Sequence, residues 1–443
     1  MGFVHLAGRR ERRDLGRRLG PDRRDRLRSD HGVPRKRAGQ VPARAPGRHR
    51  PERRRSELRK RPDAVIASRI YAPEASAASF RLAALTRELA TVATVTVLTV
   101  TDPHGPDSGI PQTVRVRRWP VLRNRSGYVR GYLPYLSFDA PLLLRLLSQP
   151  RPDVVVVEPP PTSGAVVRIV CGLRRIPYVY NAADVWSDAA ESTGAPRLVV
   201  RFVRALERWV LRGARAVLSV SDGVTARVRE LGADRAVTVG NGVDTTVFTP
   251  DGDIRGTGPF LLYAGTASEW QGADVFVRAM PHVLERHPGA RLVFLGQGSA
   301  WSSLKELAAA VAPTSVDFHP LASAHESAAW LRGARAAVVS LRPGQGYDFA
   351  FPTKVLAALG TGTPVVYAGP GEAGELIESE AMGWRCDYDV DDVAKTMIEA
   401  IEHDPMPEEP ARLAAWVEAN RSLQAVARRS VDVVLSVAGH RSI

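Results

Sequence analysis

Cysteine is scarce in this chain of 443 residues. Its two cysteines, Cys171 and Cys386, lie far apart in the sequence, which indicates neither a disulfide framework nor a thiolate metal site. No apolar run approaches the roughly 20 residues that a membrane-spanning helix needs. No group of His, Cys and carboxylate residues has the spacing of metal ligands. We therefore expect a cytoplasmic protein with reduced thiols, no bound metal and no other cofactor.

Acidic residues are few in the first part of the chain. Residues 1–61 contain 22 Lys and Arg against 7 Asp and Glu, whereas residues 62–443 contain 39 against 40. The first segment also has too few apolar residues to fold alone, and it lacks the apolar region of a secretory signal. It is either a basic disordered arm for nucleic acid or anionic lipid or an extension foreign to the native protein. Because the rest of the chain is nearly neutral, we do not expect a nucleic-acid partner.

Short apolar runs alternate with helical patterns over the remaining sequence. The runs that predict strands are 63–68, 94–100, 114–119, 153–157, 178–181, 214–220, 236–239, 260–264, 291–295, 316–318, 336–341 and 364–368. Residues 127–135 are aromatic and loop-like, and a helix is expected over 140–147. The alternation runs twice, which predicts two doubly wound α/β domains that face each other across a cleft. They comprise residues 62–250 and 259–405, joined by a Gly/Asp-rich linker at 251–258 and followed by helices in 406–443.

One stretch, residues 336–369, combines a strand, a glycine-containing loop, a helix and another strand. Pro352 suits the first helical position, where its missing N–H has no consequence, and Lys354 falls in the first turn. Loops at the carboxyl ends of parallel strands bind ligands in α/β proteins, and a helix amino terminus attracts anions. The pattern predicts a phosphate site at Pro352, Thr353 and Lys354. The alternative is a structural helix that carries a solvated lysine.

Several motifs in order resemble the family 4 retaining glycosyltransferases, which have the GT-B fold, over about residues 62 to 440. They are DAVIASRIYAPEASAASFRLAALTRELA at the start, NAADVW at 181–186, VGNGVDTTVFTP at 239–250, then LLYAGTASEWQGADVFVRAM, LVFLGQGS and FPTKVLAALGTGTPVV. The NAADVW segment is similar to the lipopolysaccharide and exopolysaccharide branch of that family. The interdomain run at 239–250 is the most specific of the motifs.

The resemblance implies that a sugar moves from a nucleotide-sugar donor to an acceptor with retention of anomeric configuration and without a metal. The donor would bind to the second domain and the acceptor to the first, and the final helix would cross back to the first. The candidate donor-binding residues are Gly265, Thr266, Gln271, Gly296, Gly298, Arg342, Asp348, Pro352, Thr353 and Lys354. The three glycines end strands, where a diphosphate needs close backbone approach. Lys354 is also a catalytic candidate, because it can stabilise the departing phosphate.

Three positions depart from the family pattern. Thr266 and Gln271 stand where typical members have an Arg and a Lys for the diphosphate. Ala357 stands where they have the Glu that contacts the ribose, and Asp348 lies near the other family Glu. Each lost charge-assisted hydrogen bond is worth about 1.5–3 kcal/mol. The sequence therefore places the main positive charge on Lys354, with Arg342 as its helper.

Asp184 is the candidate catalytic carboxylate of the first domain. It follows a strand end beside Trp186 and would orient or deprotonate the acceptor hydroxyl, or it would cap the following turn. Glu158 follows a buried strand and has the same two interpretations. The expected acceptor is a lipid-linked or other carbohydrate, with peripheral association at the cytoplasmic membrane face. Two alternatives stay open: a catalytically silent nucleotide-sugar-binding partner in glycan assembly, and a nucleotide-sugar epimerase on the same fold.

Overall fold

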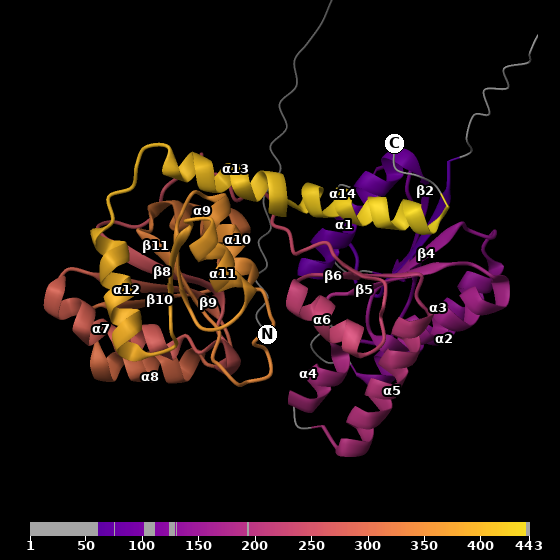
Figure 1. Ribbon diagram of the computed structural model, residues 1–443, viewed down its shortest axis with the longest axis horizontal. Coiled ribbons are helices and arrows are strands. Elements are labelled where there is room, and N and C mark those ends of the chain that lie inside the picture. Colours follow the sequence, from indigo (N-terminus) through magenta and orange to yellow (C-terminus); the bar gives the residue numbers. More distant parts are fainter. Residues whose placement is uncertain are drawn as a thin grey trace, which may run out of the picture. The chain divides into compact units, whose positions relative to one another are not determined.

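The computed structural model describes residues 61–74, 76–101, 111–123, 129, 131–192 and 195–439. The expectation for the basic segment falls almost wholly on residues 1–60, outside the described part. Within the described part, the elements alternate between strand and helix and build two parallel sheets (Figure 1). The expected α/β class and GT-B architecture are confirmed by this arrangement.

The first sheet has seven parallel strands in the order β3-β2-β1-β4-β5-β6-β7. Its strands are Asp63–Ala67 (β1), Thr94–Val100 (β2), Arg115–Trp119 (β3), Val154–Val157 (β4), Tyr178–Ala182 (β5), Ala216–Ser219 (β6) and Ala236–Thr238 (β7). Central strands such as β4 are buried on both faces and are therefore continuous apolar runs. The Arg-rich β3 alternates exposed and half-buried residues and lies at the edge, as the sequence indicates.

Helices cover both faces of this sheet. They are Ala77–Val92 (α1), Tyr132–Ser148 (α2), Pro161–Arg174 (α3), Trp186–Ser192 (α4), Arg197–Gly213 (α5) and Asp222–Glu230 (α6). Successive residues of a strand point to opposite faces, so Val65 joins the core under α2, α3 and α5, and Ile66 joins the core under α1.

The second sheet has six parallel strands in the order β10-β9-β8-β11-β12-β13. The strands are Phe260–Thr266 (β8), Arg291–Gln297 (β9), Val316–His319 (β10), Ala336–Ser340 (β11), Val365–Ala368 (β12) and Gly383–Cys386 (β13). Its helices are Glu269–Gln271 (η1), Asp274–Arg286 (α7), Trp301–Val311 (α8), Ala324–Gly333 (α9), Thr353–Gly360 (α10), Glu372–Ser379 (α11) and Val390–Glu402 (α12).

Two helices end the described chain, Glu409–Arg421 (α13) and Leu423–Val437 (α14). Leu413 and Val417 of α13 belong to a core of the second sheet, whereas Val426 and Val434 of α14 belong to a core of the first. Figure 1 shows α14 beside α1, and the two helices are in contact. The break between the helices falls at Ser422, whose hydroxyl accepts a hydrogen bond from the N–H of Ala425 and so caps α14.

Three local expectations were wrong. The predicted loop at 127–135 is helical from Tyr132, because α2 begins there and accommodates Pro134 in its first turn and Pro141 in its interior. Pro352 precedes α10 as its N-cap with extended ψ, so Thr353 is the first helical residue. The short elements α4 and β13 were not predicted.

Candidate functional site

Lys354 lies in the first turn of α10 and reaches the carboxyl end of β8. Its Nζ donates hydrogen bonds to the hydroxyl of Tyr263 and to the carbonyl of Thr266, and it stands 3.9 Å from the centre of the Tyr263 ring. The side chain passes over Gly265, where an added Cβ would come within 3.3 Å of Lys354 Cε. The structure thus brings Gly265, Thr266 and Lys354 together, and the Lys354 amine is bonded to protein acceptors.

The charge of Lys354 has no internal counter-ion among the described residues. Its two hydrogen-bond acceptors are a neutral phenol and a carbonyl, and no carboxylate within the described part pairs with it. Burial therefore lowers the pKa of the Lys354 amine well below its ordinary value of 10.5. An anion that arrives beside this amine would favour the protonated form. The arrangement suits a ligand that carries negative charge.

Glycines at the ends of β8 and β9 permit the close approach of neighbouring strands. A Cβ on Gly296 would lie 2.1 Å from the carbonyl oxygen of Gly265, and one on Gly298 would lie 1.9 Å from that of Ala267. Contacts between chain segments therefore account for both glycines without a ligand. Their predicted part in donor binding stays a prediction.

Gln271 is buried and serves a local role at the turn after β8. Its Oε1 accepts from the backbone N–H of Ser268 at 3.0 Å and from the hydroxyl of Tyr263 at 3.2 Å. Ser268 and Gln271 form a capping box around η1. Gln271, which stands at the family's cationic position, thus accepts a hydrogen bond from Tyr263, and Tyr263 in turn contacts Lys354. Its contact with a donor stays a prediction.

Arg342 follows β11 but is engaged away from Lys354. Its guanidinium pairs with Asp274 at the start of α7 and lies 3.3 Å from the hydroxyl of Tyr388. The Tyr388 hydroxyl in turn donates to the carbonyl of Gly272. These hydrogen bonds raise the pKa of Arg342 above its ordinary value. Arg342 is thus already neutralised and does not join Lys354 in the structure.

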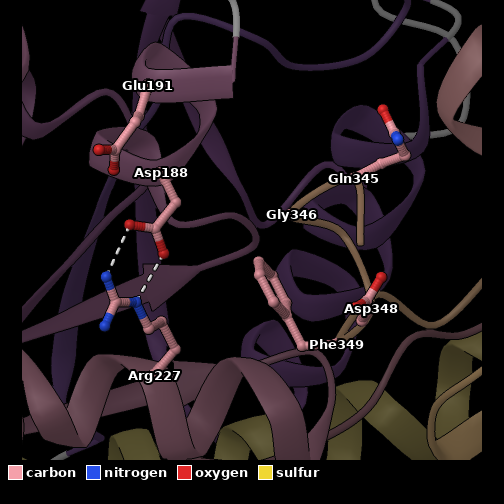
Figure 2. Close-up of a pocket in the computed structure, with 7 residues that line it drawn as sticks. All are labelled: Asp188, Glu191, Arg227, Gln345, Gly346, Asp348 and Phe349. Atoms are coloured by element: carbon pink, nitrogen blue, oxygen red, sulfur yellow. Dashed lines mark hydrogen bonds and ion pairs between the residues drawn. The ribbon is translucent and has the colours of Figure 1, made fainter. Parts of the chain in front are cut away.

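Asp348 shapes its own loop and lines a pocket of about 460 Å³. Its two carboxylate oxygens accept from the backbone N–H of Gly344 at 3.0 and 3.2 Å. Figure 2 shows the pocket, in which Arg227 of α6 holds Asp188 of α4 through two hydrogen bonds of 2.6 and 2.9 Å. The other lining residues are Glu191, Gln345, Gly346 and Phe349. Three carboxylates against one paired arginine make this pocket unsuitable for a diphosphate.

A second polar cluster lies at the carboxyl ends of β4 and β5. The buried Glu158 accepts from Arg81 Nη2 of α1 at 3.0 Å and from the side-chain amide of Asn181. Asp184 follows β5 and is exposed. Desolvation by the surrounding protein raises the pKa of the Asp184 carboxyl, and Arg81 acts in the opposite direction. Asp184 has no hydrogen-bond or ion-pair partner in the described part of the chain and has a raised pKa, whereas both oxygens of Glu158 accept a hydrogen bond.

Arg69 is a neighbouring cation that the sequence did not single out. It follows β1, donates from Nη1 to the carbonyl of Val129 at 2.7 Å, and lies 4.5 Å from the ring of Tyr135 and 5.8 Å from that of Trp186. Its buried Nε has no hydrogen-bond partner among the described residues. The signal available in the sequence was its place directly after the first strand, where α/β proteins collect functional side chains.

Comparison with known proteins gives two consecutive domain matches. The model of the glycosyl transferase 4-like domain matches residues 77–242, and that of glycosyl transferases group 1 matches residues 258–403. The glycogen synthase of Mycobacterium tuberculosis (strain ATCC 25618 / H37Rv) is 28% identical over 193 residues, which are 42% of this chain and 45% of the relative. The chain thus spans about half the length of the curated relatives that it matches.

Solved structures match over more of the chain. Sucrose-phosphate synthase from Thermosynechococcus elongatus superposes with a TM-score of 0.65 at 16% identity, covering 86% of this chain and all of the other (100%). HepE from Anabaena, in complex with UDP, superposes with a TM-score of 0.61 at 14% identity, covering 85% and 100%. At these identities the likeness concerns the fold. Among the described residues, no helix is long and apolar enough to cross a membrane.

Proposed function

Because the chain belongs to the GT-B glycosyltransferases, we propose that it transfers a sugar from a nucleotide-sugar donor to an acceptor hydroxyl with retention of configuration. The observation that carries the proposal is Lys354, a half-buried lysine at the carboxyl end of β8 whose amine pairs with no carboxylate of the described residues. The structure of HepE holds UDP on the same fold, which supports a nucleotide diphosphate as the donor's leaving group. Transfer as proposed requires no metal, since Lys354 and α10 supply the positive potential.

The donor diphosphate would lie at the amino terminus of α10. The first backbone N–H groups of that helix, at Thr353 and Lys354, have no acceptors within the helix. As the bond to the sugar breaks, the leaving phosphate oxygen gains charge, and these donors stabilise it in the transition state. Gly265 leaves the room that the Lys354 side chain needs. The amine takes up a proton when the anion binds, because the anion raises its pKa.

On the acceptor side, Asp184 would receive a hydrogen bond from the attacking hydroxyl and orient it. Its raised pKa makes it a better proton acceptor than an ordinary carboxylate. Attack on the face that the phosphate leaves would retain the anomeric configuration, assisted by the leaving phosphate itself. We propose a lipid-linked or other carbohydrate acceptor, handled at the cytoplasmic face of a membrane with which the protein associates peripherally.

The test measures thermal shifts and donor hydrolysis against a panel of nucleotide sugars. Lys354→Met is compared with the parent, and Lys305→Met is the matched control, since Lys305 is exposed on α8. Stabilisation by one nucleotide family, with hydrolysis lost only in Lys354→Met, supports the proposal. Equal responses of the two variants would place the diphosphate elsewhere.

A second candidate function is that of a catalytically silent nucleotide-sugar binder. It is favoured by one observation: Gln271 and Arg342, which flank the expected site, are both engaged internally, and Ala357 offers no carboxylate for the ribose. Such a protein would show a thermal shift with the donor but neither hydrolysis nor transfer. Turnover that disappears in Asp184→Asn would exclude this candidate.

A further inference from the structure

Helix α5 exposes three large apolar side chains along one line. Leu198, Phe202 and Trp209 are 78%, 66% and 41% exposed. Their spacing of four and seven residues places them on one side of the helix, as 3.6 residues per turn requires. The core side of α5 is separate and is formed by Val200, Val210 and their buried neighbours. These three side chains are therefore not part of the domain core.

A row of arginines runs beside this apolar line. Its members are exposed and are spaced by four and seven residues: Arg197, Arg201, Arg208 and Arg212. The first three each directly precede one of the apolar residues in the sequence, so the arginines lie beside the apolar line on the helix surface. The only carboxylate of α5, Glu207, is buried and accepts the backbone N–H groups of Trp186 and Ser187. The outward face of α5 therefore consists of an apolar stripe and a cationic stripe, with no exposed acid on the helix.

The adjacent helix α3 also exposes large apolar side chains. Ile169 and Leu173, one turn apart, are 44% and 74% exposed. Helices α3 and α5 pack together, and the guanidinium of Arg168 on α3 lies 4.3 Å from the centre of the Trp209 ring. Exposed apolar side chains and arginines thus occur on both of these packed helices.

We propose that this face of α5 and α3 docks on an anionic phospholipid bilayer, with the helices lying in the plane of the interface. A helix that lies at such an interface places apolar side chains among the acyl chains and arginines at the headgroups. Aromatic residues such as Trp209 are favoured at that depth. The phosphates of anionic lipids complement the arginine stripe, and juxtamembrane cations draw a protein to such surfaces. This face would be the surface through which the peripheral membrane association proposed above takes place. Only the assumption that the protein works at a membrane is taken from the proposed function.

A second copy of the chain fits this face less well. In a two-fold contact through α5, the same patch faces itself. The two arginine rows would then flank the shared apolar stripe, and α5 exposes no carboxylate to neutralise them. A bilayer supplies the missing negative charge. The observations on charge therefore favour lipid over self-association.

The experiment uses the full chain and cosedimentation with vesicles of phosphatidylglycerol and phosphatidylcholine in about equal parts. Leu198→Ser/Phe202→Ser should bind about tenfold or more weakly than the parent, because two apolar side chains no longer enter the acyl region. The matched control is Leu321→Ser/Met406→Ser, which removes two side chains that are 60% and 63% exposed outside this face. That control should bind as the parent does.

Charge is tested separately with Arg201→Gln/Arg208→Gln. This variant should lose binding to the anionic vesicles and should differ little from the parent on pure phosphatidylcholine, where the anionic lipid is absent. The control is Arg278→Gln/Arg286→Gln on α7. Parent-like binding by both α5 variants would overturn the proposal and would assign the membrane contact to another part of the chain, such as residues 1–61. A dimer that dissociates in Leu198→Ser/Phe202→Ser would overturn it in favour of self-association. Donor hydrolysis without vesicles should be equal in all these variants, so a failed transferase assignment would be seen independently.

Discussion

Replacing Lys354 by Met should weaken donor binding and at the same time make the folded protein equally or more resistant to heat. The loss of one charge-assisted hydrogen bond to a diphosphate costs about 1.5–3 kcal/mol, which is about a 10- to 150-fold rise in dissociation constant. The gain in stability has a separate cause. Lys354 pairs with no carboxylate in the described part of the chain, and burial lowers its pKa. Met fills a similar volume and carries no charge whose desolvation would destabilise the folded protein.

The pH dependence follows from the direction of that shift. Below the lowered pKa the amine is protonated in the folded and the unfolded chain, so the full penalty of the buried charge destabilises the parent. As the pH rises from the lowered pKa towards the ordinary value of 10.5, the folded protein has released the proton and the unfolded chain still holds it, so the penalty declines. The stability advantage of Lys354→Met should therefore be largest at low pH and disappear near pH 10.5.

Two measurements check this reasoning. Thermal unfolding of parent and variant over a pH series gives the stability difference. Titration calorimetry of the donor nucleotide in buffers of different ionisation enthalpy gives the number of protons bound, which should be positive for the parent and absent for Lys354→Met. A variant that unfolds at a clearly lower temperature at neutral pH, with unchanged nucleotide affinity, would refute the argument. Lys354 would then be a structural residue that holds β8 and α10 together.

Three further outcomes are expected. Asp184→Asn should lower turnover about 10²–10⁴-fold at unchanged donor affinity. In the parent, the raised pKa of Asp184 means that this carboxylate becomes protonated at a higher pH than an ordinary one, so turnover should begin to fall at that higher pH as the solution is acidified. Glu158→Gln should destabilise the fold by about 3–5 kcal/mol in denaturant titrations, since it leaves Arg81 buried without its partner, and adding Arg81→Met should recover part of the loss. Gly298→Ala should lower the free energy of unfolding by about 1–3 kcal/mol or more, because the added Cβ collides with the backbone of Ala267. Gly344→Ala is the control for backbone strain alone, since Gly344 also has a positive φ but has open space around the position of a Cβ.

The buried strands were predictable because each is a short apolar run between turn residues. Strand β4 and its neighbours are buried on both faces, so the sequence there carries no polar interruption. The helix α4 has only 7 residues, too few to show a helical period. Strand β13 has 4 residues at the edge of its sheet, only one of them buried. The start of α2 was missed because Pro134 lies in its first turn and favours a loop in the sequence. Pro141 lies within the predicted helix at 140–147 and did not obscure it.

The site was predictable only where local sequence determines it. The start of α10 and the presence of Lys354 there follow from the order of Pro352, Thr353 and the apolar residues after them. The partners of Lys354 do not: Tyr263 lies 91 residues away in the sequence. Arg81 and Glu158 are 77 residues apart and meet only because β4 lies beside β1 and α1 follows β1. A single sequence contains no signal for such pairs.

A lysine with a lowered pKa is also a nucleophile. The chain contains only five lysines, at positions 36, 60, 305, 354 and 395. Lys305 and Lys395 are exposed. Because burial favours the free amine of Lys354, that position should react with acylating and arylating reagents at a pH where ordinary lysines do not. If the diphosphate binds as proposed, it would raise the pKa of this amine, which then takes a proton from solvent, and it would cover the same atom. The rate of labelling at one residue would then report donor occupancy, without a labelled sugar or an acceptor.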